Sequence, residues 1–252
     1  MGKLSYRGLL CAVAAFMLLL PSCTAGRQTY MDFVGGYKGM TPVRIDNSCE
    51  GVIAYYPEFS RIDLVCGVMP SQEEGDVVLC CEAAFTHDLL DGFAHSNIDG
   101  DHVSGGRRYA GAACRDNSGA FTWSAGAGWR FVRGEYGAAL DGAASGGGMG
   151  FGQALIVVDG EAVTPLWRSG EHEYRALCEK GGRLCIVDSR GTVSYEQFVR
   201  LLVAYGVDQA LYLDMGSGWN HSWWRDSAGK THEIHPRIDK CRYCTNWITF
   251  YK

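Results

Sequence analysis

The sequence has no excess of basic residues. It contains 23 Lys and Arg against 28 Asp and Glu, which gives a formal net charge of −5. Binding to nucleic-acid phosphates requires a basic surface, and this composition argues against one. We therefore expect no nucleic-acid partner. The hydrophobic content of 47% is sufficient for the core of one sizeable domain.

Long hydrophobic segments are also missing, and none after residue 22 could cross a bilayer. Near the start, Lys3 and Arg7 precede an apolar run of twelve residues, Leu9 to Leu20, which suits the hydrophobic part of a secretory signal. The run ends in Leu20-Pro21-Ser22-Cys23, which resembles a lipobox. We expect residues 1–22 to be a lipoprotein signal peptide and Cys23 the lipidation site. The protein is then exported and lipid-anchored in the bacterial cell envelope, periplasmic or at the surface, with no other membrane contact. Ordinary cleavage that leaves Cys23 as a thiol is the alternative.

A second closely spaced pair of metal ligands is absent too. Cys241-Arg-Tyr-Cys244 has the spacing of half a zinc site, but no second C-x-x-C or His pair with ligand spacing accompanies it. Because an exported chain permits disulfides, we interpret this pair as a structural disulfide or as buried free thiols.

Three histidines, His87, His95 and His102, lie near several aspartates and superficially suggest a calcium or zinc site. The segment Asn97–Gly100 has the composition of an ordinary turn, however. We therefore predict no metal site and no cofactor.

No internal repeat divides the chain. Residues 23–45 are polar and resemble a tether, and residues 46–252 are expected to form one domain. Alternation and short apolar runs predict strands at 52–56, 62–68, 76–82, 121–123 and 129–132. The glycine-rich stretch Gly142 to Gly152 is expected to be a mobile surface loop.

The C-terminal half has clearer local signals. Asp159-Gly160 and Gly181-Gly182 predict hairpin turns, the second joining strands 174–180 and 183–187. Ser194 and Gly206 have the character of the N-cap and C-cap of a helix over 195–205, which leads to a strand at 210–213. We therefore expect an α/β (α+β mixed) fold: a single domain with a mixed, strand-rich sheet, a C-terminal β-α-β unit and few helices.

This arrangement places charged residues at one rim of the sheet. Asp188 and Asp214 each follow a strand end, and parallel strands in a β-α-β unit end at the same edge. With a two-residue turn at Gly181-Gly182, the residue numbers of two paired positions add up to 363, so Arg175 lies opposite Asp188. Either these residues form a site, or they form a structural ion pair that holds the sheet edge.

The same residues carry a resemblance to a known family. Its motifs here are an arginine on a strand (Arg175), Asp188–Gly191 before a helix, and Gly206–Leu211 followed by Leu213–Ser217. This order resembles the phosphodiester glycosidase family, over roughly residues 75–220. Glu82 stands where the family has an asparagine, and Met215 replaces the first glycine after the aspartate. The resemblance implies a divergent member among exported lipoproteins.

The resemblance also implies roles for these residues. Asp214 would be the catalytic base or nucleophile, with Glu82 as its partner carboxylate and Arg175 as the catalytic residue that stabilises the phosphate. The residues expected to bind substrate are Asp188, Gly216, Ser217, Trp219, Asn220 and Arg225. Trp219, Trp223 and Trp224 would stack on sugar rings, or else pack in the core.

The expected function is therefore that of an exported glycoside hydrolase-type enzyme that cleaves a sugar-1-phosphodiester or a related glycan linkage. Its partner would be a glycan or sugar-phosphate substrate. The alternative is a non-catalytic glycan-binding lipoprotein that retains the fold.

Overall fold

The computed structural model describes residues 41–114, 116–163, 170–215 and 220–252. The protein is mainly β, with 46% of the described residues in strands and 14% in helices. Three large sheets and one two-stranded sheet account for the strands, and every pair of neighbouring strands is antiparallel. The predicted α/β class with a mixed sheet is therefore wrong.

The largest sheet has seven strands in the order β1-β2-β14-β13-β16-β10-β11. Their bounds are β1 Val43–Asp46, β2 Val52–Pro57, β10 Leu155–Val158, β11 Glu161–Ala162, β13 Arg175–Lys180, β14 Arg183–Ser189 and β16 Gln209–Leu213. A small sheet pairs β12 (Glu171–His172) with β15 (Val193–Ser194).

Two further sheets have five strands each. One has the order β18-β17-β4-β19-β3, formed by β3 Arg61–Cys66, β4 Val77–Glu82, β17 Ser222–Arg225, β18 Thr231–His235 and β19 Asn246–Tyr251. The other has the order β6-β5-β9-β7-β8, formed by β5 His102–Ser104, β6 Arg107–Tyr109, β7 Gly119–Ser124, β8 Gly128–Arg133 and β9 Met149–Gln153. Short 3₁₀ turns lie at η1 (His95–Asn97) and η2 (Asp239–Tyr243).

The helix α3 (Tyr195–Tyr205) has the predicted ends. The Ser194 side chain accepts a hydrogen bond from the Gln197 backbone N–H, and Gly206 closes the helix with φ +83°. That left-handed conformation favours glycine, because other residues are strained there. The predicted helix is confirmed.

The β-α-β unit needs a correction. β14 and β16 run in the same direction, because each pairs antiparallel with β13, but they are not neighbours. β13, the predicted hairpin partner of β14, lies between them, and β2 takes the other edge of β14. The hairpin itself follows the predicted register, with Arg175 opposite Asp188 and Lys180 opposite Arg183. The hairpin at Asp159-Gly160 also forms, with Val158 opposite Glu161.

The predicted glycine loop is a helix followed by a strand, α2 (Gly137–Ser145) and β9. A Cβ atom on Gly152 would lie 2.3 Å from the Tyr136 hydroxyl, and one on Gly150 would lie 2.9 Å from the Leu140 side chain. The glycines therefore let α2 and the residue before it pack closely on the strand. The loop prediction is wrong because close packing, and not mobility, explains these glycines.

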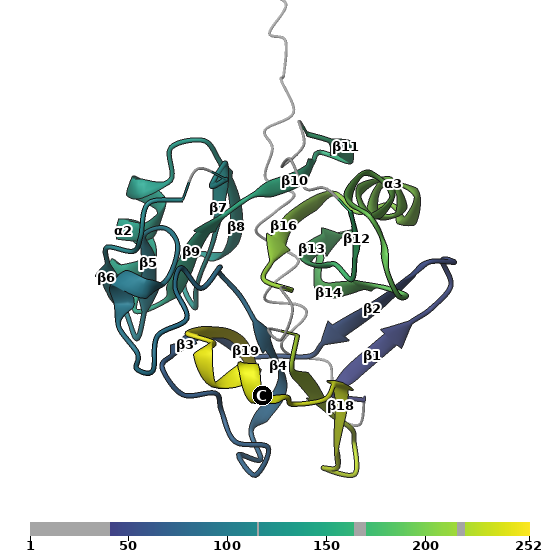
Figure 1. Ribbon diagram of the computed structural model, residues 1–252, viewed down its shortest axis with the longest axis horizontal. Helices are drawn as coiled ribbons and strands as arrows, with labels where there is room; N and C mark the ends of the chain where they lie inside the picture. Colours follow the sequence, from purple (N-terminus) through teal and green to yellow (C-terminus); the bar gives the residue numbers. More distant parts are fainter. Residues whose placement is uncertain (1–40, 115, 164–169, 216–219) are drawn as a thin grey trace, which may run out of the picture.

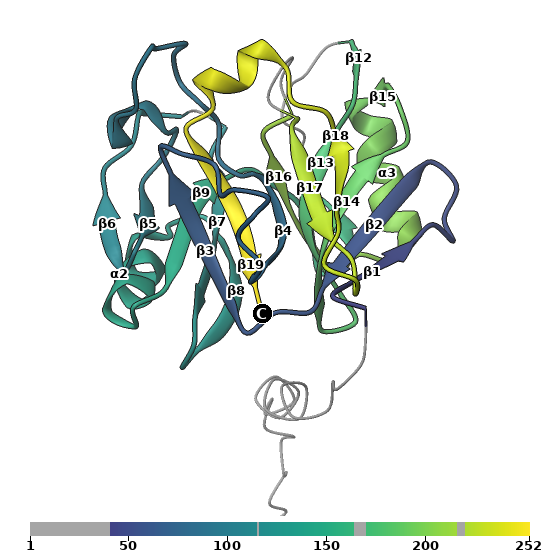
Figure 2. The same ribbon diagram turned by 90° about the horizontal axis from the view of Figure 1, so that it is seen from below.

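Two apolar cores flank the large sheet. On one face α3 packs on residues such as Ala54, Ala176 and Val187. On the other face, Leu177 and Leu211 share a core with residues from both five-stranded sheets. Figure 1 shows α2 and α3 on opposite flanks of the molecule, and Figure 2 shows the sheet of β3, β4 and β19 between the other two large sheets. Among the described residues, no helix is long and apolar enough to span a membrane.

Candidate active site

A buried ion pair lies at one end of the large sheet. Arg175 begins β13 and is completely buried, and Asp188 on β14 is 2% exposed. The guanidinium donates from Nε to Asp188 Oδ1 and from Nη2 to Asp188 Oδ2, both at 2.7 Å. This two-point contact follows from the hairpin register, which sets the two residues directly opposite each other.

Two neighbours complete this group. Arg175 Nη2 also donates to the Ser222 hydroxyl at 2.8 Å, and His235 Nε2 lies 3.4 Å from Asp188 Oδ2. Burial raises the pKa of Asp188, but Arg175 and His235 together outweigh burial and hold that pKa below its usual range. Asp188 is therefore a stable carboxylate in the folded protein.

One end of the guanidinium remains available. Arg175 Nη1 is buried and has no hydrogen-bond partner among the described residues. A buried N–H donor normally has an acceptor, so this nitrogen is suited to an anionic oxygen of a ligand.

The second group is built around Glu82. This residue ends β4 and is 2% exposed, and neither carboxyl oxygen has a hydrogen-bond partner in the described part of the chain. Burial, followed by the nearby Asp214 carboxylate, raises the pKa of Glu82 well above its usual range, and the Cys244 thiol and Arg175 offset this only in part. Glu82 therefore favours its protonated form.

Asp214 lies directly after β16 and is 6% exposed. Its Oδ2 atom accepts a hydrogen bond of 3.3 Å from the Thr86 backbone N–H. Its own N–H donates to the carbonyl of Ala83 at 3.0 Å, which joins the end of β16 to the residue after β4. That bond is the reason the two carboxylates, Glu82 and Asp214, lie close together.

The two groups share one end of the sheet. Arg175 pairs with Asp188 on one side and with Leu213 on the other, and Asp214 follows Leu213 directly. The Arg175 charge lowers the pKa of Glu82, which also shows that these side chains are near each other. The predicted contact between Arg175 and Asp188 is confirmed, while the catalytic roles stay predictions.

Of the other residues that the sequence predicted for the site, the structure describes Arg225 and Asn220. Arg225 is buried in β17, and its guanidinium donates to four backbone carbonyls, those of Gln72, Glu74, Val77 and Gly229. It therefore fastens loops to the sheet, and its contacts give no support to the predicted substrate binding. The carbonyl of Asn220 accepts a hydrogen bond from Ser222. Gly216, Ser217, Trp219 and Cys23 lie outside the described residues.

Of the three tryptophans expected to stack on sugar rings, the structure describes Trp223 and Trp224. Trp223 is completely buried in a core cluster of the β17 sheet. Trp224 stacks on His232, with ring centroids 4.5 Å apart. Trp223 therefore packs in the core, which is the alternative role given above for the tryptophans.

Sequence reasoning missed Ser222, His235, Thr86 and Cys244, which all contact or influence the four charged residues. In the sequence Ser222 lies between Trp219 and Trp223, but no local pattern marks it as a site residue. The others come from distant strands and loops, whose pairing no local pattern reveals. A separate set, Cys66, His95 and His102, has the arrangement of metal ligands.

Comparisons with known proteins agree at the level of the fold. No protein-family model matches the sequence, and no curated protein matches it. Among solved structures, the chain is similar to the zebrafish N-acetylglucosamine-1-phosphodiester alpha-N-acetylglucosaminidase catalytic domain auto-inhibited by its pro-peptide. The TM-score is 0.54 at 10% identity, over 84% of this chain and 83% of that one. A hypothetical protein from Synechocystis gives a TM-score of 0.46 at 13% identity, over 83% of this chain and 61% of that one. At such identity the first likeness shows a fold shared with a glycosidase catalytic domain.

Proposed function

We propose that this protein is a glycoside hydrolase-type enzyme that cleaves a sugar-1-phosphodiester or a related glycan linkage. The observation that carries the proposal is the meeting of three features at one sheet end. These are a buried carboxyl group with a raised pKa (Glu82), a second carboxyl group near it (Asp214), and a buried guanidinium nitrogen of Arg175 without an acceptor among the described residues. The shared fold with a glycosidase catalytic domain supports it.

The chemistry assigns a task to each group. The bond between the anomeric carbon and the phosphate oxygen breaks, and water supplies the hydroxyl of the sugar and the proton of the phosphate monoester. Asp214 acts on the anomeric side, as base or nucleophile, while protonated Glu82 supplies the partner carboxyl group. Arg175 Nη1 holds a phosphate oxygen and stabilises the departing charge.

Asp188 has a positioning role in this scheme. Its two hydrogen bonds fix the guanidinium plane, and they leave Nη1 as the nitrogen free to meet the substrate. A guanidinium fixed in this way needs no reorganisation when charge develops on the leaving group.

A panel of α-linked sugar-1-phosphate methyl esters, carrying glucose, mannose or N-acetylglucosamine, tests the proposal. Release of free sugar and of methyl phosphate is measured together. Asp214→Asn should lower turnover by about 10²–10⁴-fold, the usual contribution of acid–base catalysis. Glu179→Gln is the matched control, because Glu179 is another partly buried carboxyl on the same sheet with a raised pKa. Unchanged turnover in a folded Asp214→Asn protein would contradict the proposal.

A non-catalytic glycan-binding lipoprotein is the second candidate function. Its support is the burial of the charged residues, since Arg175, Asp188, Glu82 and Asp214 are all at most 6% exposed. Calorimetry with the same panel separates the two functions. Binding without sugar release favours this candidate, and release favours the enzyme.

We also propose that the protein is exported and anchored through Cys23. The support is the basic start, the apolar run and the lipobox-like Leu20–Cys23 segment. Expression of the full chain in a bacterium fed with labelled palmitate should give a labelled protein in the membrane fraction. Cys23→Ser should remove the label, and Cys49→Ser should retain it. Equal labelling of all three proteins would contradict anchoring at Cys23.

A further inference from the structure

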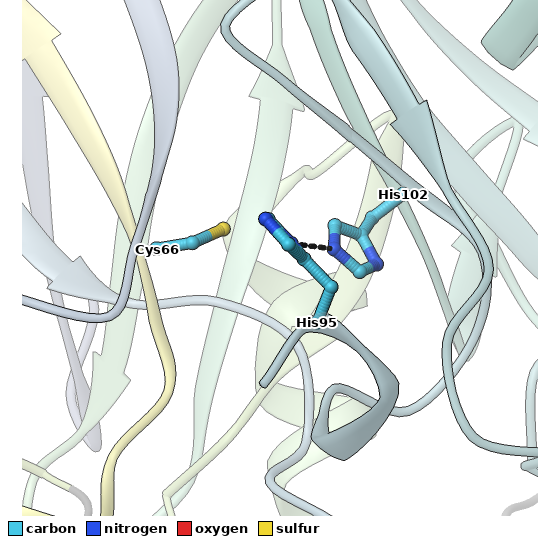
Figure 3. A group of neighbouring side chains, drawn as sticks. All are labelled: Cys66, His95 and His102. Atoms are coloured by element: carbon cyan, nitrogen blue, oxygen red, sulfur yellow. Dashed lines mark hydrogen bonds between the residues drawn. The ribbon is translucent and has the colours of Figure 1, made fainter. Parts of the chain in front are cut away.

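Three side chains outside the candidate active site point toward one another. Cys66 ends β3, His95 begins η1 and His102 begins β5. One ligand atom from each, a sulfur and two ring nitrogens, lie within 4.8 Å of one another. Figure 3 shows His95 between the other two side chains. This is a Cys-His-His set contributed by three separate segments.

The hydrogen bonds around His102 prepare it as a ligand. His102 Nδ1 lies 3.2 Å from the carbonyl of Gly100, an acceptor that requires the proton to be on Nδ1. The lone pair of the ring is therefore on Nε2, which faces His95 Nδ1 at 2.9 Å. Metal-bound histidines in proteins usually have their second ring nitrogen held in this way.

The two histidine rings are also held in place. His102 is completely buried. The His95 ring stacks on Tyr109 at 3.4 Å between centroids and meets the edge of Phe93 at 4.9 Å. Both rings are therefore held in position before any ion binds.

The spacing suits a tetrahedral ion with short bonds. Two zinc–nitrogen bonds of about 2.0–2.1 Å at a tetrahedral angle separate the nitrogens by roughly 3.3 Å. His95 Nδ1 and His102 Nε2 are already 2.9 Å apart, so a small opening admits the ion, and the proton on His95 Nδ1 moves through solvent to Nε2 of the same ring. The free Cys66 thiol supplies the third ligand on losing its proton.

Charge considerations are compatible with a thiolate-bound dication. Arg107 lies over the Tyr109 ring that stacks on His95, and the oppositely charged Asp101 precedes His102 in the chain. A Cys66 thiolate would remove one of the two charges that zinc brings, so the site as a whole would gain one positive charge on binding.

We propose that Cys66, His95 and His102 bind one zinc ion, with water in the fourth position. Sulfur and imidazole donors select zinc over the calcium or magnesium that aspartate-rich sites prefer. The ion would join β3 of one five-stranded sheet to β5 of the other. It would also hold η1 in place. This turn lies at the far end of the segment that begins with Thr86, whose backbone N–H donates to Asp214.

Zinc binding to the full chain, freed of metal by a chelator, is the direct measurement. A competing chromophoric chelator gives the affinity, and elemental analysis gives the stoichiometry. The wild-type chain should bind one zinc with sub-micromolar affinity, and its melting temperature should rise by several degrees. Cys66→Ser should weaken binding at least about a hundredfold, because even the loss of a residue that orients a ligand costs 10–100-fold.

Two matched controls separate this site from other thiols. Cys49→Ser removes another half-buried thiol, and Cys244→Ser disrupts the C-x-x-C pair; both should bind zinc like the wild type. Binding that survives Cys66→Ser, or that is lost with Cys244→Ser instead, overturns the proposal.

Cobalt provides a readout that needs no variant. Co(II) added to the wild-type chain should give the visible bands of a tetrahedral site and a near-ultraviolet thiolate-to-cobalt band. Absence of the thiolate band overturns the assignment even if Cys66→Ser fails to fold. These readouts are metal binding and stability, so they stand or fall independently of the proposed hydrolysis.

Discussion

Replacing Asp188 with asparagine should destabilise the protein strongly. The carboxylate accepts two hydrogen bonds of 2.7 Å from Arg175, and the two side chains are 0% and 2% exposed. Asparagine keeps one acceptor, but its amide group then faces a guanidinium N–H, and the Arg175 charge stays buried without a counter-ion. Removing one partner of such a pair typically costs about 3–5 kcal/mol.

Urea unfolding measures this loss. With a denaturant slope of about 2–3 kcal/mol per molar for a chain of this size, the midpoint should fall by about 1–2.5 M. Asp141→Asn is the matched control, because Asp141 also contacts an arginine, Arg108, at 2.7 Å but is 65% exposed. Its loss should be below about 1 kcal/mol.

Two further measurements sharpen this prediction. Because the folded-state pKa of Asp188 is lowered, its stabilising effect is present above about pH 3.9 and is lost as the pH falls through the folded-state value. The difference between wild type and Asp188→Asn should therefore shrink in acid. The double variant Arg175→Met, Asp188→Leu removes both charges and should recover much of the lost stability. If Asp188→Asn loses no more stability than Asp141→Asn, the burial argument is refuted.

Three smaller changes test other parts of the structure. Because the pKa of Glu82 is raised in the folded state, the free energy of unfolding is highest below about pH 4.3 and falls as the pH rises toward and through that folded-state pKa. Glu82→Gln should remove this fall, so the free energy of unfolding should change less from pH 5 to 9. An unchanged pH profile would contradict the prediction. Gly182→Ala should cost about 1–2 kcal/mol in urea unfolding, because Gly182 has φ +71° and no atom lies within 4 Å of the added Cβ, so only backbone strain remains; a neutral effect would contradict the turn geometry. Ser194→Ala should cost about 1 kcal/mol through the lost hydrogen bond to Gln197, with Ser194→Asp retaining the cap; equal losses in both variants would exclude capping as the cause.

Structural features that depend only on adjacent residues were predictable from the sequence. Gly181-Gly182 fixes a two-residue hairpin, and this alone set Arg175 against Asp188. Ser194 and Gly206 mark the ends of α3, because a serine side chain can cap the first turn and glycine readily adopts the left-handed conformation at the end. In these cases the information and the structure lie within a few residues of each other.

Features that depend on distant partners were not predictable in the same way. Strand order beyond the hairpin is one of them. No local pattern tells that β16 pairs with β13 and β2 with β14, all antiparallel, so the predicted mixed sheet and fold class were wrong. The metal ligands are another, since Cys66 and His102 are far apart in sequence and meet only because β3 and β5 approach each other. Each histidine alone reads as a residue in a turn.

Asp214 shows how the two kinds of information combine. A carboxylate at the end of the apolar strand β16 can be read from the sequence, but its surroundings depend on another sheet. The hydrogen bond from the Asp214 N–H to Ala83 joins the ends of β16 and β4, and it is this joint that brings Glu82 beside Asp214. Burial is the main cause of the raised pKa of Glu82, and the Asp214 carboxylate that this joint brings near it adds to the effect. Glutamate at position 82 therefore places a second, buried carboxyl group near Asp214 at the junction of the two sheets.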